Sequence, residues 1–525
     1  MEAPSKADFR LPLLLSIVLI LGMFLGFKLS NSLHRSLPNS SDAYSLDDFI
    51  ELLDRHYVDT LNNEKLVQQG IEGIISTLDP HTVYISKADL PRINEQLQGN
   101  FYGIGIEFYQ ERDTVFISNI MKDGPAAHES IFPGDRILTV NDSLVSGRSL
   151  SDETIIAKIR GLEHSSVRIG VLHPDQSKQM ITVKRAQIPQ HSVSAYYHFN
   201  TSTAYIRINV FSETTYDEFY KALQELKKQP FQHLIIDVRD NPGGYMDAVT
   251  RIADELIDGK QLLLSTKGKN DDEKVYSHPG GLFTTGKVSI LINENAASAS
   301  EILAGCIQDL DRGVVIGRRS FGKGLVQEQF ELPGEAAIRI TTARYYLPSG
   351  RCIQKSYKEG NTNYQHDIAD RYRHGKLTTT DSISTQLKKF YTLKKRIVYE
   401  GEGIRPDQFI PVDTLLDRFL EPVFTKHLIE QVCHRYYYFH RQEFSEYKSI
   451  ESFSKTFTLP TQVIHEIQHI ISSFEPSCPA SLKISFDRKI YRYCKAEFAQ
   501  LLFHQNGWMY ELNQEDVIVQ TALKN

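Results

Sequence analysis

The stretch VSILINENAASASEILAGCIQDL, residues 288–310, decides the fold of the region that carries the chemistry of this chain. Its first five residues, 288–292, are mainly apolar and β-branched, which predicts a buried strand. From Ile302 to Leu310 the apolar residues recur with helical spacing, so we expect Ser298 at a strand-to-helix turn. Unpaired backbone N–H groups at the start of that helix would lie where an oxyanion forms beside the serine hydroxyl.

A serine nucleophile needs a base, and no histidine occurs between residues 279 and 365. A second apolar run, 313–317, leads instead to Lys323, which stands between two glycines. A lysine can serve as the base when burial lowers its pKa from about 10.4 by roughly two to three units. Gln327 could orient the amine without adding charge. A helix-capping serine and a surface lysine are the structural alternatives.

Two phrases and their spacing resemble the carboxyl-terminal processing peptidases, the tail-specific Ser/Lys proteases of peptidase family S41. The phrases are Ala-Ser-Ala-Ser-Glu-Ile at 297–302 and Phe-Gly-Lys-Gly at 321–324, with Gln327 after them. The resemblance implies that Ser298 is the nucleophile, Lys323 the general base and Gln327 its orienting partner. It also implies an α/β protease core of the crotonase/ClpP-like type, with no metal and no cofactor required.

A further apolar run, 233–238, ends in the turn Asn-Pro-Gly-Gly at 241–244. A plain strand-to-helix turn would account for it. The family pattern Asp-x-Arg-x-Asn-x-Gly-Gly matches residues 237–244, and it implies an oxyanion hole. Gly243 or Gly244 would give one N–H, with Gly243 preferred, and Ala299 would give the other. Each such donor is worth about 3–4 kcal/mol in the transition state.

Residues 98–187 resemble a PDZ domain inserted before the protease core. The phrase Phe-Pro-Gly-Asp-Arg-Ile at 132–137 predicts a tight turn into a strand. The glycine-punctuated loop Gly103, Ile104, Gly105, Ile106 could hold a peptide carboxylate with its N–H groups, while the peptide adds a strand to the sheet edge. The segment 151–159 would be the helix that flanks this groove.

The N-terminal segment from Leu11 to Phe27 is apolar except for four small or kinking residues. Its length suits a short membrane-spanning helix or the core of a signal peptide. The poor cleavage site after it favours an uncleaved anchor in the inner membrane. The bulk of the chain is then expected on the periplasmic side, with simple export as the alternative.

The expected organisation is a multidomain α/β (α+β) protein. Its segments are an anchor or signal (1–35), an N-terminal helical segment (36–97), the PDZ domain (98–187), the protease core (188–358 and 397–412), an insertion that forms a surface excursion (359–396) and a C-terminal helical domain (413–525). The phrase Leu-Asp-Pro-His at 78–81 closes the helical segment, and we expect His81 to be a turn residue without chemistry.

Composition bears on three other properties: nucleic-acid binding, disulfide bridges and zinc binding. Charged residues make up 24% and the net charge is −6, which argues against a general nucleic-acid binder. The five cysteines are scattered without a CxxC pair, although a Cys433–Cys494 or Cys478–Cys494 bridge stays open. His465 and His469 are the two histidines of a His-Glu-x-x-His pattern, which is typical of zinc sites.

The expected function is therefore an endopeptidase, anchored or exported, alone or as a homo-oligomer, that engages polypeptides through their carboxyl ends. One rival is a PDZ-based peptide-binding module on an inactive protease scaffold. A second rival is a zinc hydrolase built on the two C-terminal histidines.

Overall fold

The computed structural model describes residues 22–23, 45–269, 272–379, 387–412, 414–472 and 478–525. The chain separates into two compact units, residues 1–73 and residues 74–525. The first contains α2 (Leu46–His56), which Ser45 caps by accepting the N–H of Asp48 at 3.0 Å. Helix α3 (Asn63–Ile75) begins in the same unit.

The apolar segment expected to span a membrane, Leu11 to Phe27, lies outside the described residues except for 22 and 23. Within the described part of the chain, none of the helices combines the length and apolar character that a bilayer crossing requires.

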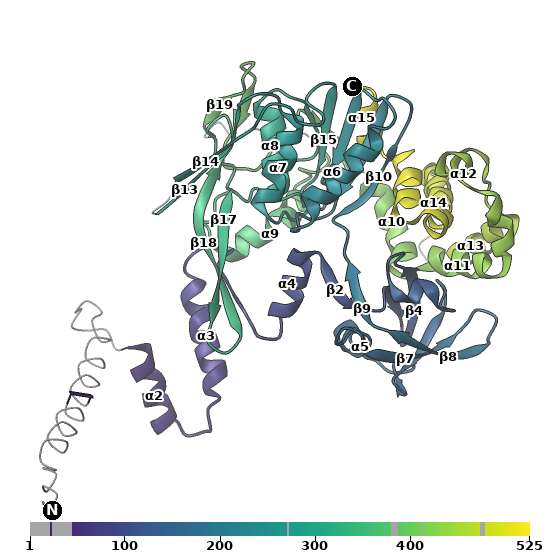
Figure 1. Ribbon diagram of the computed structural model, residues 1–525, viewed down its shortest axis with the longest axis horizontal. Helices are drawn as coiled ribbons and strands as arrows, with labels where there is room; N and C mark the ends of the chain where they lie inside the picture. Colours follow the sequence, from purple (N-terminus) through teal and green to yellow (C-terminus); the bar gives the residue numbers. More distant parts are fainter. Residues whose placement is uncertain (1–21, 24–44, 270–271, 380–386, 413, 473–477) are drawn as a thin grey trace, which may run out of the picture. The chain divides into compact units, whose positions relative to one another are not determined.

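The second unit is built around a six-stranded sheet whose strands are parallel except the first (Figure 1). Its strands, in order, are β10 (Val193–His198), β11 (Thr203–Ile208), β12 (His233–Asp237), β15 (Lys287–Ile292), β16 (Val314–Gly317) and β21 (Gln408–Phe409). The helices between them are α6 (Thr215–Leu226), α7 (Met246–Leu256) and α8 (Ala299–Asp309). This architecture confirms the expected α/β core.

Both faces of this sheet are covered, as a parallel sheet requires. Successive side chains of a strand point to opposite faces. Ile206, Ile236 and Ile290 pack in one hydrophobic cluster with residues of α6, α7 and α8. Tyr205 and Leu291 belong to a second cluster that includes residues 509–522.

The last two helical segments of the chain therefore belong to the protease core. Helix α14 (Ala480–Asn513) is interrupted at His504, where φ is 55° and ψ is −147°, and α15 (Val517–Leu523) follows it. Val519 and its neighbours, which lie in the segment 413–525 expected to form a helical domain, pack on the second face of the sheet.

A second, five-stranded sheet carries the segment after Lys323. Strand β17 (Leu325–Leu332) pairs with β18 (Ala336–Tyr346), and β18 also pairs with β13 (Leu262–Gly268), which pairs with β14 (Asp272–Tyr276). The outer strand β1 (Val83–Ile85) pairs antiparallel with β18, with Val83 opposite Arg339. Strand β1 thus lies within residues 36–97, the expected N-terminal helical segment. Helix α4 (Leu90–Gln98) follows that strand.

The PDZ region forms its own sheet and core. The sheet order is β3 (Ile106–Glu111), β4 (Thr114–Ile120), β5 (Arg136–Val140), β7 (Ser166–Leu172) and β8 (Lys178–Lys184), with β6 (Ser143–Leu144) on β5. Helix α5 (Asp152–Ile159), the turn η1 (Pro125–His128) and the pair β2 (Asn100–Gly103) and β9 (Ala186–Pro189) complete it. Strand β3 lies at the edge of this sheet.

The remaining C-terminal helices surround an aromatic core that includes Phe444, Phe453, Phe457 and Phe498. These elements are α10 (Thr414–Thr425), α11 (Leu428–His440), η2 (Arg441–Glu446), α12 (Ile450–Thr456), α13 (Thr461–Ser472) and the first part of α14. All five cysteines are free, and the Cys433 thiol donates to the carbonyl of Cys494 at 3.9 Å. The structure therefore contains neither of the disulfides left open by the sequence.

The insertion is not a mere surface excursion. It contains α9 (Asn361–Arg373) and the strand β19 (Lys389–Tyr391), which pairs with β20 (Ile397–Tyr399). Tyr364 and Arg371 of α9 are 4% and 2% exposed. The expectation failed because a polar composition conceals two residues that are buried against the protease core.

Candidate active site

Ser298 lies at the sharp turn between β15 and α8, as the sequence predicts. Its φ is 54° and its ψ is −114°, a backbone conformation that residues other than glycine rarely adopt. Helix α8 starts at the next residue, and the Ser298 side chain is partly exposed. The turn therefore presents a hydroxyl at the positive end of a helix.

Lys323 lies in the loop between β16 and β17 and is partly buried. Burial, with a smaller contribution from the Arg339 guanidinium, lowers the pKa of Lys323 to about 8. Its Nζ donates to Oε1 of Gln327 at 2.6 Å. The strand pairing shifts register between Val326 and Gln327, a bulge that re-aims the side chain of Gln327.

Two buried side chains hold the backbones of Ser298 and Lys323 together. The Glu301 carboxylate accepts the N–H of Ser298 at 2.9 Å, of Lys323 at 2.8 Å and of Gly322 at 2.8 Å, and also the Ser320 hydroxyl. The Tyr345 hydroxyl lies 3.2 Å from the Ser298 carbonyl oxygen and 2.5 Å from that of Lys323. Burial raises the pKa of Glu301, and its four donors oppose that rise.

The side chains of Ser298 and Lys323 are not hydrogen-bonded to each other here. Across the described residues, the Lys323 amine donates instead to Gln327, at 2.6 Å. The structure thus joins the two residues through their backbones, and the roles that the sequence suggests for their side chains stay predictions.

The glycine turn after β12 lies directly against Ser298. A Cβ on Gly243 would come within 2.7 Å of the Ser298 Cβ and 3.0 Å of the Ala299 nitrogen. The N–H of Gly243, however, donates to Oδ1 of Asn241 at 2.8 Å. Among the described residues, the N–H groups of Gly244 and Ala299 have no acceptor. The geometry therefore goes against the preference for Gly243 as an oxyanion donor, because its N–H is already engaged.

An ion-pair network holds that turn in place. Asp237 is fully buried and accepts from Arg239, Arg207 and the Tyr205 hydroxyl. These cations hold the pKa of Asp237 well below its usual range, against the opposing effect of burial. Arg239 also pairs with Asp516, just before α15, at 2.7 Å.

The sequence reasoning missed His81. Its backbone carbonyl accepts the Nε2–H of Gln327, and its ring Nε2 lies 2.7 Å from the Tyr364 hydroxyl. Burial and the Lys323 cation lower the pKa of His81 to about 4, so the ring is neutral near pH 7. A turn motif far from Lys323 in sequence gave no sign of this contact.

The loop at residues 103–106 of the PDZ domain offers two backbone N–H groups to a ligand. Within the described residues, the N–H groups of Ile104 and Gly105 make no hydrogen bond, and the carbonyls of both residues are occupied. Gly105 has φ of +78°, and a Cβ there would approach the Gly124 Cα to 2.6 Å. Gly103 ends β2 and Ile106 begins β3.

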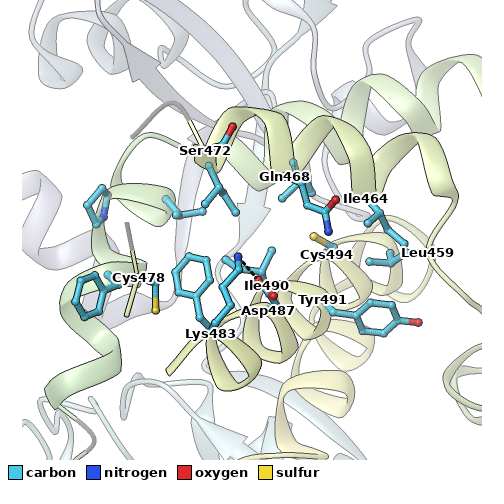
Figure 2. A pocket seen from close by; sticks show the side chains of 16 residues that line it. Leu459, Ile464, Gln468, Ser472, Cys478, Lys483, Asp487, Ile490, Tyr491 and Cys494 are labelled. Atoms are coloured by element: carbon cyan, nitrogen blue, oxygen red, sulfur yellow. Dashed lines mark hydrogen bonds and ion pairs between the residues drawn. The ribbon is translucent and has the colours of Figure 1, made fainter. Parts of the chain in front are cut away.

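An apolar cavity lies elsewhere, among the C-terminal helices (Figure 2). It measures about 600 Å³ and includes Leu459, Ile464 and Ile490 in its lining, with an ion pair between Lys483 and Asp487 at 2.8 Å. It contains none of the residues expected to form the active site.

The zinc alternative gains no third ligand. His465 and His469 lie exposed on α13, and Glu466 between them pairs with Arg435. Over the described ranges, His, Cys, Asp and Glu residues form no group of three or more that could hold a metal ion.

Two protein-family models match parts of this chain. A family model described as peptidase family S41 matches residues 202–363, and a PDZ domain model matches residues 91–172. Residues 202–363 are therefore similar to peptidase family S41, and residues 91–172 are similar to PDZ domains. The S41 match spans the turn at Gly243, Ser298 and Lys323, and it continues into α9 of the insertion.

Two proteins similar to this chain come from bacteria. The carboxy-terminal processing protease CtpB of Bacillus subtilis is 35% identical over 309 residues, which cover 58% of this chain and 64% of that protein. A probable CtpA-like serine protease of Staphylococcus epidermidis is 32% identical, with 58% and 61% covered. The match thus spans about three fifths of the length of these relatives.

Among solved structures, the photosystem II D1 C-terminal processing protease is 25% identical to this chain. The match covers 58% of this chain and 88% of the other, with a TM-score of 0.34.

Proposed function

We propose that this chain is a serine endopeptidase that cleaves exported polypeptides which its PDZ domain binds by their C-termini. The single observation that carries the proposal is that Glu301 accepts the backbone N–H groups of both Ser298, at a helix N-terminus, and Lys323, whose pKa is lowered to about 8. The nearby His81 ring contacts the Tyr364 hydroxyl, so we assign the role of base to the Lys323 amine.

The chemistry follows from these groups. A neutral Lys323 amine has two N–H bonds and one lone pair, so it can donate to Gln327 Oε1 and still accept the Ser298 proton. The serine oxygen then attacks the peptide carbonyl. The resulting ammonium protonates the leaving amine, and water hydrolyses the serine ester by the same base.

The oxyanion would be stabilised by the N–H of Ala299 together with a glycine of the adjoining turn. Gly244 is the better second donor, since its N–H has no acceptor among the described residues. Gly243 would have to release Asn241 first. Each donor would contribute about 3–4 kcal/mol to the transition state.

The PDZ domain would supply recognition of the polypeptide end. The open N–H groups of Ile104 and Gly105 suit a carboxylate, and the edge strand β3 can accept a peptide strand. The N-terminal apolar segment would keep the enzyme at the membrane, outside the cytoplasm, where exported substrates occur.

The test compares wild-type protein with Ser298→Ala and Lys323→Ala on a polypeptide that has an apolar C-terminus. Cleavage sites are mapped by mass spectrometry, and a covalent serine probe reports the reactive hydroxyl. We expect both substitutions to abolish cleavage without loss of folding. Peptide binding by a wild-type protein that neither cleaves nor reacts would favour the rival, an inactive scaffold. Cleavage that survives in Lys323→Ala would refute the assigned base.

A further inference from the structure

Helix α9 of the insertion places two buried side chains next to the segment that carries Lys323. Tyr364 is 4% exposed and Arg371 is 2% exposed, seven residues apart on one face of the helix. The proposed chemistry uses neither of them. Arg371 donates to carbonyls of the loop before Lys323, and the Tyr364 hydroxyl contacts His81 and Gln354. Helix α9 therefore lies next to the segment that carries Lys323.

We propose that α9 is a positioning element for the general base, in which Tyr364 fixes Gln327 and Lys323 through His81 and Gln354, and Arg371 fixes the loop before Lys323. This inference rests on the proposed function and assigns a role in it to the insertion.

The Tyr364 hydroxyl contacts two residues that hold the surroundings of Lys323 in place, His81 and Gln354. It lies 2.7 Å from His81 Nε2, and the backbone carbonyl of His81 holds the side-chain amide of Gln327. That contact directs Oε1 of Gln327 toward the lysine amine. Because the His81 ring is neutral, one arrangement satisfies both neighbours of the hydroxyl: it donates to His81 Nε2 and accepts from Gln354 Nε2 at 3.2 Å.

Gln354 links the same hydroxyl to the backbone beside the lysine. Its Oε1 accepts the N–H of Gly324 at 2.8 Å, directly after Lys323. Tyr364 is therefore connected to the lysine along two paths, one to its side chain and one to its backbone.

Arg371 holds the loop on the other side of the lysine. Its Nη1 donates to the Ser320 carbonyl at 2.9 Å and the Arg319 carbonyl at 3.2 Å. Its Nη2 donates to the Phe321 carbonyl at 3.3 Å, and Asp367 pairs with the guanidinium at 2.7 Å. A planar fork that binds three successive carbonyls restrains the loop in a way that an ammonium cannot reproduce.

The charges around Lys323 set the direction of a pH effect. Burial and Arg339 on β18 disfavour the positive charge of Lys323, whereas Glu301 on α8 and Asp79 before β1 favour it. Lys355 beside α9 and the neutral His81 complete this surrounding. Gln327 Oε1 adds an acceptor for the ammonium. If Gln327 turns, the ammonium loses that acceptor and the amine becomes less basic.

The first experiment compares Tyr364→Phe with Tyr372→Phe, a tyrosine on the same helix that is 56% exposed. We expect Tyr364→Phe to lower kcat by about tenfold with KM changed less than about twofold, since positioning acts on the base and not on substrate binding. The midpoint of the pH–kcat/KM profile should move to lower pH. Tyr372→Phe should match wild type in kcat, in KM and in the pH midpoint.

A second comparison tests the path through Gln327. In a Gln327→Ala background, Tyr364→Phe should lose most of its effect on kcat, because the two substitutions break the same chain of contacts. Arg371→Lys keeps the charge and removes the fork, and should lower kcat by about tenfold or more. Its control, Arg373→Lys, concerns an exposed arginine that pairs with Asp370.

The outcomes separate this inference from the proposed function. Cleavage that wild type shows and Ser298→Ala lacks establishes the peptidase, whatever α9 does. If Tyr364→Phe and Arg371→Lys, both folded by thermal melting, then keep the wild-type kcat and pH midpoint, the positioning role is overturned. A lower melting temperature with unchanged kcat and pH midpoint overturns it as well, because that pattern is purely structural.

Discussion

The backbone N–H groups of Ser298 and Lys323, 25 residues apart in sequence, both donate to the same oxygen, Oε2 of Glu301, at 2.9 and 2.8 Å. The proposed nucleophile and base therefore share one buried anchor. The Tyr345 hydroxyl lies beside the carbonyls of the same two residues. The geometry of the site depends on these two side chains before any side-chain contact between serine and lysine is made.

Glu301→Gln should test that anchor. An amide offers one acceptor oxygen where the carboxylate offers two, so at least one of its four buried donors loses its partner, at a cost of about 1–3 kcal/mol. We expect a lower free energy of unfolding in denaturant and a kcat reduced by about tenfold or more. Glu328→Gln, on an exposed position of β17, is the matched control and should change neither. Equal behaviour of the two variants would contradict the anchor.

The pH dependence of cleavage should report Lys323. The amine is a base only when it is unprotonated, so kcat/KM should be low at pH 6 and rise with pH through about 8, the lowered pKa of this lysine. His81 cannot produce that limb, since its pKa of about 4 lies far below it. Initial rates between pH 5.5 and 9.5 measure the limb. A midpoint near 6.5 would point to a histidine base instead.

Two glycines of the PDZ domain share a backbone conformation and differ in their surroundings. Gly105 and Gly147 have φ of +78° and +77°, but only at Gly105 would a Cβ meet backbone, the Gly124 Cα at 2.6 Å. Alanine costs about 1 kcal/mol of strain at either site. Gly105→Ala should in addition displace the carboxylate-binding loop and weaken binding of C-terminal peptides by about tenfold or more.

Binding is measured by fluorescence anisotropy with an apolar C-terminal peptide and its C-terminally amidated form. Gly147→Ala should retain wild-type affinity. If both variants bind as wild type does, the loop is not the peptide site.

The last helix should matter to the stability of the protease core. Val519 on α15 is fully buried, whereas Val517 on the same helix is 64% exposed. Val519→Ala removes packing from the second face of the parallel sheet and should lower the free energy of unfolding by about 2 kcal/mol. Val517→Ala should stay within about 0.5 kcal/mol of wild type. Equal denaturation midpoints for the two would mean that α15 is not part of the core.

The sequence by itself determined the strand, turn and helix around Ser298, the glycine turn at 241–244 and the edge strand of the PDZ domain. These features depend on apolar periodicity and turn chemistry, which act over a few residues. It also placed Gln327 within reach of Lys323, and the structure forms that hydrogen bond.

Only the tertiary structure decided which helices and strands pack against each other. An apolar helix face indicates that it is buried but not against which partner, so α15 could not be assigned to the protease sheet and β1 could not be paired with β18. The same limit hid α9, whose polar sequence contains Tyr364 and Arg371. Their burial becomes favourable only when the fold supplies hydrogen-bond partners from residues far apart in the chain.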